Sequence, residues 1–181
     1  MGVYSTLAEA LRYPAPGRIE KLRDASLDPA VKELIELNTF IDIVDCMTLS
    51  EWEELYTRTL DLNPSVAPYV GFQIWGESYQ RGNFMSQLIR AMREEHINLE
   101  GELPDHLVPV LVYLDAASEP LPELLSVLDK AVASMQSALR EKDQNNPYLH
   151  IFNAVRRTTK NIEVESPEQT SWQELPIYGS S

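Results

Sequence analysis

Apolar residues recur at helical spacing along most of this chain. The first stripe lies in residues 4–11, and further stripes lie in residues 84–96 and 121–139. The strongest of them, in 121–139, consists of Leu121, Leu124, Leu125, Leu128, Val132, Met135 and Leu139. Steps of three and four residues put these side chains on one face of a helix, whereas a half-buried strand needs alternating apolar and polar residues. The pattern therefore predicts amphipathic helices in all three segments.

Residues that favour helix starts divide the chain further. Asp28-Pro29 offers an N-cap followed by a proline in the first turn, which predicts a long helix that ends near Met47. Ser50, with Glu53 three residues later, has the spacing of a capping box. Asn146-Pro147 predicts the start of the last helix. The helix after Ser50 would bury one face, made of Trp52, Leu55, Tyr56 and Thr59.

The segment between residues 61 and 79 has no clear period. Pro64 and Pro68 exclude a continuous helix and predict a firm bend. Residues 69–79 (YVGFQIWGESY) then combine aromatic side chains with two glycines, without clean alternation or a clean helical stripe. We expect a buried helical or irregular piece here, with a strand as the alternative.

The order of these segments predicts an all-α fold, because they are joined by short connections and no run of alternating apolar residues occurs. A length of 181 residues fits one domain with a substantial core. We expect a single helical bundle in residues 1–160. Residues 161–181 carry four glutamates without basic neighbours and two prolines, so we expect an acidic C-terminal tail without fixed structure of its own.

The chain is strongly acidic, with a formal net charge of −13 and a sequence pI near 4.6. Such a surface repels phosphate backbones and anionic headgroups, which disfavours binding to nucleic acid and to membrane surfaces. It suits a partner that carries arginines or lysines, and it equally fits a soluble protein with no such partner.

Cysteine content and hydropathy bear on the compartment. Cys46 is the single cysteine, which excludes an internal disulfide and a cysteine-rich metal site, and we expect a partly buried, unreactive thiol. Residues 1–10 lack the basic and apolar regions of an export signal, and nowhere do about 18 apolar residues follow one another. We therefore expect a cytoplasmic protein with no integral membrane association.

The most unusual stretch is Glu102–Leu107, which reads ELPDHL and precedes another helical stripe. Its Asp105-His106 pair is open to four interpretations: a helix cap, a metal site, an acid–base pair or a polar anchor for a peptide. A metal-dependent hydrolase would need further ligands, and the other histidines, His96 and His150, have the surroundings of surface or packed residues. The chain also lacks a glycine-rich phosphate loop, a GxSxG elbow and an HExxH pair. We therefore expect neither catalysis nor a resident metal or redox cofactor.

Aromatic side chains gather in the irregular segment before residue 84. They are Tyr69, Phe72, Trp75 and Tyr79. Most such residues fill protein cores. In an irregular segment that contains glycine they also suit the wall of a groove, because aromatic surfaces hold apolar peptide side chains at a low entropic cost. Both interpretations stay open from the residues alone.

Four motifs carry a resemblance to a known family. They are WEELYTRTLDL at residues 52–62, Asn63-Pro64, PYVGFQIWGESYQRG at 68–82, and GELPDHLVPVLVYL at 101–114. In this order they resemble the TorD/DmsD/NarJ family, the cytoplasmic assembly chaperones of molybdenum-containing oxidoreductases. The ELPDHL piece is closest to the NarJ-like branch, which is also described as nitrate reductase delta-subunit-like.

The resemblance implies a TorD-like helical bundle without catalytic activity. It also implies a partner, the N-terminal leader of the apo-form of a molybdopterin oxidoreductase catalytic subunit, which the chaperone holds until cofactor is inserted. A twin-arginine leader would pair its guanidiniums with acidic groups. The peptide-binding residues implied by the family, together with the aromatic groove residues, are Asp105, His106, Glu102, Tyr56, Pro64, Tyr79, Phe72 and Trp75. A homodimer is compatible with this role, and a permanent structural subunit of a reductase complex is an alternative to it.

Overall fold

The computed structural model describes residues 2–160 and residue 162. The helices in this part of the chain are α1 (Val3–Ala10), α2 (Arg18–Ser26), α3 (Pro29–Lys32), α4 (Ile35–Asp45), α5 (Leu49–Tyr56), the π-helix η1 (Thr57–Asp61), α6 (Val70–Trp75), α7 (Tyr79–Glu94), α8 (Leu107–Ala116), α9 (Pro122–Lys142) and α10 (Tyr148–Thr159). Tyr69 and His106 form an isolated antiparallel bridge, and the described residues contain no strand. The all-α prediction is therefore confirmed for this part. None of its helices combines the length and the apolar character that a membrane crossing requires.

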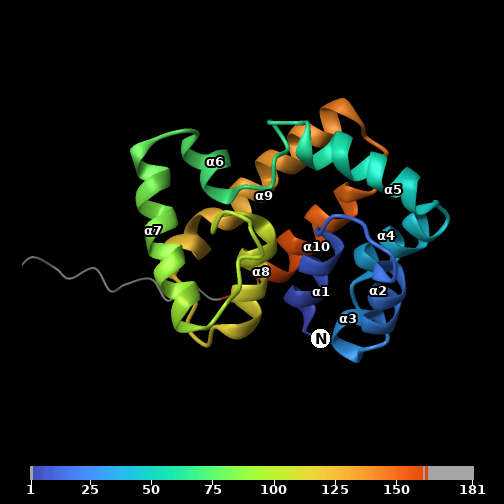
Figure 1. Ribbon diagram of the computed structural model, residues 1–181, viewed down its shortest axis with the longest axis horizontal. Coiled ribbons are helices and arrows are strands. Elements are labelled where there is room, and N and C mark those ends of the chain that lie inside the picture. The colour runs from blue at the N-terminus through green and yellow to red at the C-terminus, as the bar shows by residue number, and fades with distance from the viewer. Residues whose placement is uncertain (1, 161, 163–181) are drawn as a thin grey trace, which may run out of the picture.

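The helices pack around α10 and α9 (Figure 1). α10 lies at the centre of the bundle and contacts α9, α4 and α1, while α1 also packs against α8. The long helix α9 extends from the side of α6 and α7 toward α5. The N-terminal helices thus occupy one side of the bundle, and α6 to α8 occupy the other.

The strongest apolar stripe in the sequence forms the core face of α9. Its buried members are Leu124, Leu128, Val132, Met135 and Leu139. They face the buried side of α10, near whose start the Tyr148 ring lies 5.1 Å from the ring of Phe40. Trp52 donates a hydrogen bond from Nε1 to the Tyr148 hydroxyl at 3.1 Å. Because buried aromatic rings contribute large apolar areas, this cluster joins α4, α5 and α10 firmly.

The helix predicted for residues 28–47 is divided in two. Asp28 does cap the first part, since its carboxylate accepts a hydrogen bond from the Ala30 amide at 2.9 Å. The first helix stops because Leu34 leaves the helical region (φ −85°, ψ 82°) with its side chain buried. The Asn38 side chain then donates to the Lys32 carbonyl at 3.1 Å and to the Leu34 carbonyl at 3.1 Å, and the Leu34 carbonyl also accepts the Asn38 amide.

The capping box of α5 lies two residues earlier than predicted. The Thr48 amide donates to the Glu51 carboxylate at 2.7 Å, and the Glu51 amide donates to the Thr48 hydroxyl at 3.3 Å. The prediction of Ser50 and Glu53 was wrong because both pairs have the required spacing, and the helix already begins at Leu49.

Three further expectations have different outcomes. Residues 69–79 contain α6, which Gly76 terminates with φ 59°, so the expected helical piece is confirmed. Cys46 is exposed rather than partly buried, because the chain leaves α4 at this residue. The acidic tail predicted for residues 161–181 lies outside the described residues, apart from residue 162.

Candidate functional site

The ELPDHL segment is held beside the start of α6 by two backbone hydrogen bonds. The Val70 amide donates to the Asp105 carbonyl at 2.7 Å, and the Leu107 amide donates to the Pro68 carbonyl at 2.8 Å. These bonds surround the isolated bridge described above. They place the proline bend next to the first turn of α8, although all of α7 separates the two segments in sequence.

The carboxylate of Asp105 is fully buried and forms an ion pair with Arg81 of α7. It accepts hydrogen bonds from Arg81 Nε at 2.9 Å and from Arg81 Nη2 at 3.3 Å. Arg81 Nη1 donates to Glu77 at 2.8 Å, and the guanidinium carbon lies 5.6 Å from the ring centroid of Tyr69 and 5.4 Å from that of Phe72. Both oxygens of Asp105 are therefore occupied within the fold. The helix-cap interpretation of Asp105 is wrong, because its carboxylate binds α7 instead of the amides of α8.

His106 is the N-cap of α8. Its Nδ1 accepts a hydrogen bond from the Val108 amide at 3.2 Å, and its ring packs edge-on against Tyr69 at 5.0 Å. Because Nδ1 is an acceptor, the neutral ring carries its proton on Nε2. Burial lowers the pKa of His106 to about 4, so the ring is uncharged at neutral pH. Nε2 has no hydrogen-bond partner among the described residues, which leaves one donor available to a ligand.

His106 lines a surface cavity of about 220 Å³, which we call the His106 pocket. Its other lining residues are Leu11, Arg12, Tyr13, Arg18, Tyr56, Glu100, Glu102 and Val108. The Tyr56 hydroxyl donates to the Leu11 carbonyl at 3.2 Å, and burial raises the pKa of Tyr56. The Glu102 carboxylate receives a long hydrogen bond from the Tyr69 hydroxyl at 3.5 Å. The pocket thus brings three predicted site residues together: Glu102 supplies a carboxylate, His106 an imidazole donor and Tyr56 an aromatic wall.

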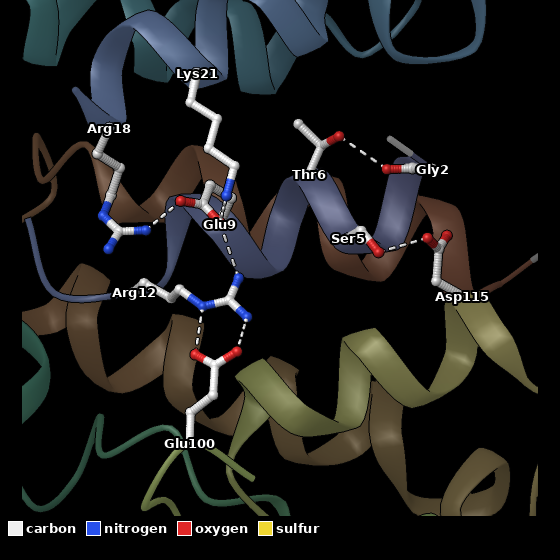
Figure 2. Close-up of polar contacts among 9 residues, drawn as sticks. All are labelled: Gly2, Ser5, Thr6, Glu9, Arg12, Arg18, Lys21, Glu100 and Asp115. Atoms are coloured by element: carbon white, nitrogen blue, oxygen red, sulfur yellow. Dashed lines mark hydrogen bonds and ion pairs between the residues drawn. The ribbon is translucent and has the colours of Figure 1, made fainter. Parts of the chain in front are cut away.

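The buried carboxylate of Glu9 holds two residues that line this pocket, Arg12 and Arg18 (Figure 2). Glu9 of α1 is only 3 % exposed and pairs with Arg12 and Lys21 at 2.9 Å each, and also with Arg18. Arg12 in addition donates to both carboxylate oxygens of Glu100, from Nε at 3.0 Å and from Nη2 at 2.7 Å. These contacts hold α1, α2 and the loop before ELPDHL in one arrangement around the pocket.

Sequence reasoning missed the buried ion pairs of Glu9 and Arg81, although the sequence contains a signal for both residues. Glu9 falls within the buried face of α1, and Arg81 shares the buried face of α7 with Phe84 and Leu88. A charged residue inside an apolar stripe is almost never fully buried unless it is paired. The stripe therefore indicates an ion pair, while the identity of the partner depends on the tertiary fold.

Four predicted site residues lie elsewhere. Phe72 is half-buried against Arg81, and Trp75 packs on Phe84 with ring centroids 5.1 Å apart. Tyr79 at the start of α7 is 82 % exposed, and Pro64 is exposed in the turn after η1. None of the four lines the His106 pocket, so the eight predicted residues do not form one cavity.

The geometry gives no support to the metal-hydrolase alternative. Both oxygens of Asp105 bind Arg81, and Nδ1 of His106 caps α8. Within residues 2–160 and 162, no three histidine, cysteine, aspartate or glutamate side chains are grouped so that they could hold a metal ion.

Gly71 should resist substitution because it packs directly on this ion pair. A Cβ atom there would lie 2.9 Å from Asp105 Oδ2, and 3.1 Å from atoms of both Arg81 and Phe84. We expect Gly71→Ala to lower the free energy of unfolding by about 1 to 3 kcal/mol, as overpacking does. Chemical denaturation measures it. Gly82→Ala is the matched control, since that helical position has open space, and we expect it to be neutral or stabilising. Equal stability of the Gly71 variant and the wild type would contradict the packing described.

A comparison with protein-family models gives no match, and a comparison with curated proteins gives none either. The resemblance to the TorD/DmsD/NarJ family therefore stays a prediction that rests on the motifs at residues 52–114. The structure bears out its coarser part, the all-α fold, and leaves the TorD-like assignment a prediction.

Proposed function

We propose that this protein is an assembly chaperone that binds the N-terminal leader of a molybdopterin oxidoreductase catalytic subunit. The observation that supports this most is the His106 pocket, because the motif that carries the family resemblance also supplies two of its polar groups. Glu102 offers a carboxylate without an ion-pair partner in the described chain, and His106 offers its Nε2 proton.

The chemistry of the pocket suits a peptide segment. A carboxylate pairs with an arginine or lysine side chain, and a neutral imidazole donor can meet a backbone carbonyl of the same peptide. The aromatic walls of Tyr13 and Tyr56 give apolar contact. Small-molecule and cofactor sites usually enclose about 300 to 1,000 Å³. At about 220 Å³ the His106 pocket is better matched to one or two peptide side chains.

In this proposal the protein acts in the cytoplasm and carries no resident cofactor. It holds the apo-subunit until the molybdenum cofactor is inserted, and where the leader is a twin-arginine signal it delays export until then. The chain's acidic balance of −13 favours the approach of such a basic leader. Asp105 takes part by positioning: its ion pair with Arg81 and its carbonyl bond to Val70 hold the segment that presents Glu102 and His106.

The test is titration of the purified protein with synthetic leaders from molybdoenzyme subunits encoded beside it. We expect micromolar or tighter binding, about −8 kcal/mol or better. Glu102→Gln should weaken it about fivefold, since a partly exposed ion pair is worth up to about 1 kcal/mol. Glu119→Gln, at an exposed loop position away from the pocket, is the control and should bind like the wild type.

Three results would redirect this proposal. Absence of binding to every leader tested would remove the chaperone function. Permanent co-purification with the mature enzyme would favour a structural subunit. Stoichiometric metal that survives chelation would revive the hydrolase alternative.

A further inference from the structure

A second hollow adjoins the His106 pocket and shares Tyr13 with it. This hollow, which we call the α5 hollow, encloses about 360 Å³ on the surface of α5 and η1. Its walls include Tyr13, Glu53, Glu54, Arg58 and Leu62. The Tyr13 ring stands edge-on against Tyr56 of the first pocket, with ring centroids 5.2 Å apart. Tyr13 therefore lies between the two hollows and forms part of the wall of each.

Large apolar side chains are open to water in the α5 hollow. Leu62 is 74 % exposed and Tyr13 is 49 % exposed, whereas the neighbouring Leu60 is buried. The exposure of Leu62 has a local cause. The Leu62 amide donates a hydrogen bond to the carbonyl of Thr57, five residues earlier, at 2.9 Å, as in a π-helix. Such turns are rare and frequently occur at functional sites. Apolar exposure beside a polar rim is typical of a surface that contacts a partner.

The charges along the two hollows are unevenly paired. Arg12, Arg18 and Lys21 bind Glu9, and Arg12 also binds Glu100, so these charges are already engaged with one another. The remaining carboxylates, Glu53, Glu54 and Glu102, form no ion pair within the described part of the chain. Against these three stands one guanidinium without an ion pair there, that of Arg58. The surface formed by both hollows thus complements a basic segment with apolar side chains.

We infer that the leader bound at the His106 pocket continues over Tyr13 into the α5 hollow. An apolar side chain of the leader covers Leu62 there, and basic side chains meet Glu53 and Glu54. This inference rests on the proposed function and adds the direction and the chemistry of the second contact. The hollows share a residue, so an extended or helical segment crosses from one to the other without leaving the surface.

The test uses a fluorescein-labelled leader of roughly 30 residues and fluorescence anisotropy. We expect Leu62→Asp to weaken binding about tenfold, because it replaces a covered apolar side chain by a charge. Leu27→Asp is the matched control, since Leu27 is 76 % exposed and lines neither hollow. Both positions are open to water, so both variants should melt like the wild type.

The proposed contact of the leader with Glu53 and Glu54 is tested by a second variant with its own control. Glu53→Gln/Glu54→Gln should weaken binding several-fold and flatten its dependence on salt, as loss of partly exposed ion pairs does. Glu94→Gln/Glu95→Gln at the C-terminal end of α7 removes two adjacent exposed carboxylates that line neither hollow, and it should change neither the affinity nor its salt dependence.

The outcomes separate the two proposals. If the wild type binds the leader, Glu102→Gln weakens it and the Leu62 and Glu53/Glu54 variants do not, the further inference is wrong and the proposed function stands. If the wild type binds no leader, both are overturned. If Leu62→Asp dissociates an oligomer in analytical ultracentrifugation and leaves leader affinity unchanged, the α5 hollow is a contact between copies of this chain, and the inference is likewise overturned.

Discussion

Replacing Asp105 with alanine is expected to lower the free energy of unfolding by about 3 to 5 kcal/mol, the typical cost of removing one partner of a buried ion pair. Asp105 is fully buried, and Arg81 is 6 % exposed, so the guanidinium would keep its charge without the carboxylate that receives two of its hydrogen bonds. Urea denaturation at neutral pH measures the loss. A helix cap alone would account for only about 0.5 to 2 kcal/mol.

Two variants control this prediction. Glu77→Ala removes the exposed partner of the same guanidinium, and we expect a cost below about 1 kcal/mol. Asp105→Leu/Arg81→Met removes both buried charges, and it should recover much of the stability that the single change loses. An Asp105→Ala variant that melts like the wild type but no longer binds leader would contradict the positioning role and make Asp105 a direct peptide contact.

Acid is expected to destabilise the protein through His106. Burial lowers the pKa of His106 from 6.5 to about 4 in the folded chain. The unfolded chain therefore takes up a proton below about pH 6.5, while the folded chain does so only near pH 4. The stability that depends on an uncharged His106 is fully present above pH 6.5, and it is lost as the pH falls from 6.5 toward 4. At about 1.36 kcal/mol per pKa unit, it amounts to roughly 3 kcal/mol.

The measurement compares the stability of the wild type and of His106→Asn between pH 7 and pH 4. Asparagine still accepts the capping hydrogen bond of α8 but does not titrate. Titration of the carboxylates affects both proteins, so the difference between their unfolding free energies isolates His106. We expect that difference to shift by roughly 3 kcal/mol across the window. Two parallel stability curves would show that the ring is not buried as described.

The parts of this fold that sequence reasoning predicted are those with a local cause. The stripe of α9 and the start of α10 follow from spacing and from Asn146, whose side chain accepts a bond from the Tyr148 amide at 3.0 Å. Spacing alone does not distinguish two possible capping boxes at the start of α5, because Thr48 with Glu51 and Ser50 with Glu53 both have the required spacing. The break at Leu34 has a tertiary cause, because a buried side chain there outweighs continued helix.

The candidate site depends on contacts that no local pattern contains. Asp105 meets Arg81 from the preceding helix, and Glu100 meets Arg12, which follows the first helix. The sequence indicated that Asp105 and His106 were unusual, yet their roles differ: one forms a buried ion pair and the other caps a helix. Adjacent residues at a helix start point in different directions, so only the packing of α7 and α8 separates their functions.

The first helix, α1, packs against α8 and α10, which both lie far from it in the sequence. Tyr4 donates a hydrogen bond to the carbonyl of Thr158 at 3.1 Å, so the first helix finds its partner near the end of the described chain. Contacts between such distant segments form late and slow folding. A nascent chain that ends before residue 100 lacks Glu100, Glu102, His106 and Val108 of the pocket wall. The walls of the His106 pocket that lie near α1 therefore gain the support of α10 only after nearly all of the described chain has been synthesised.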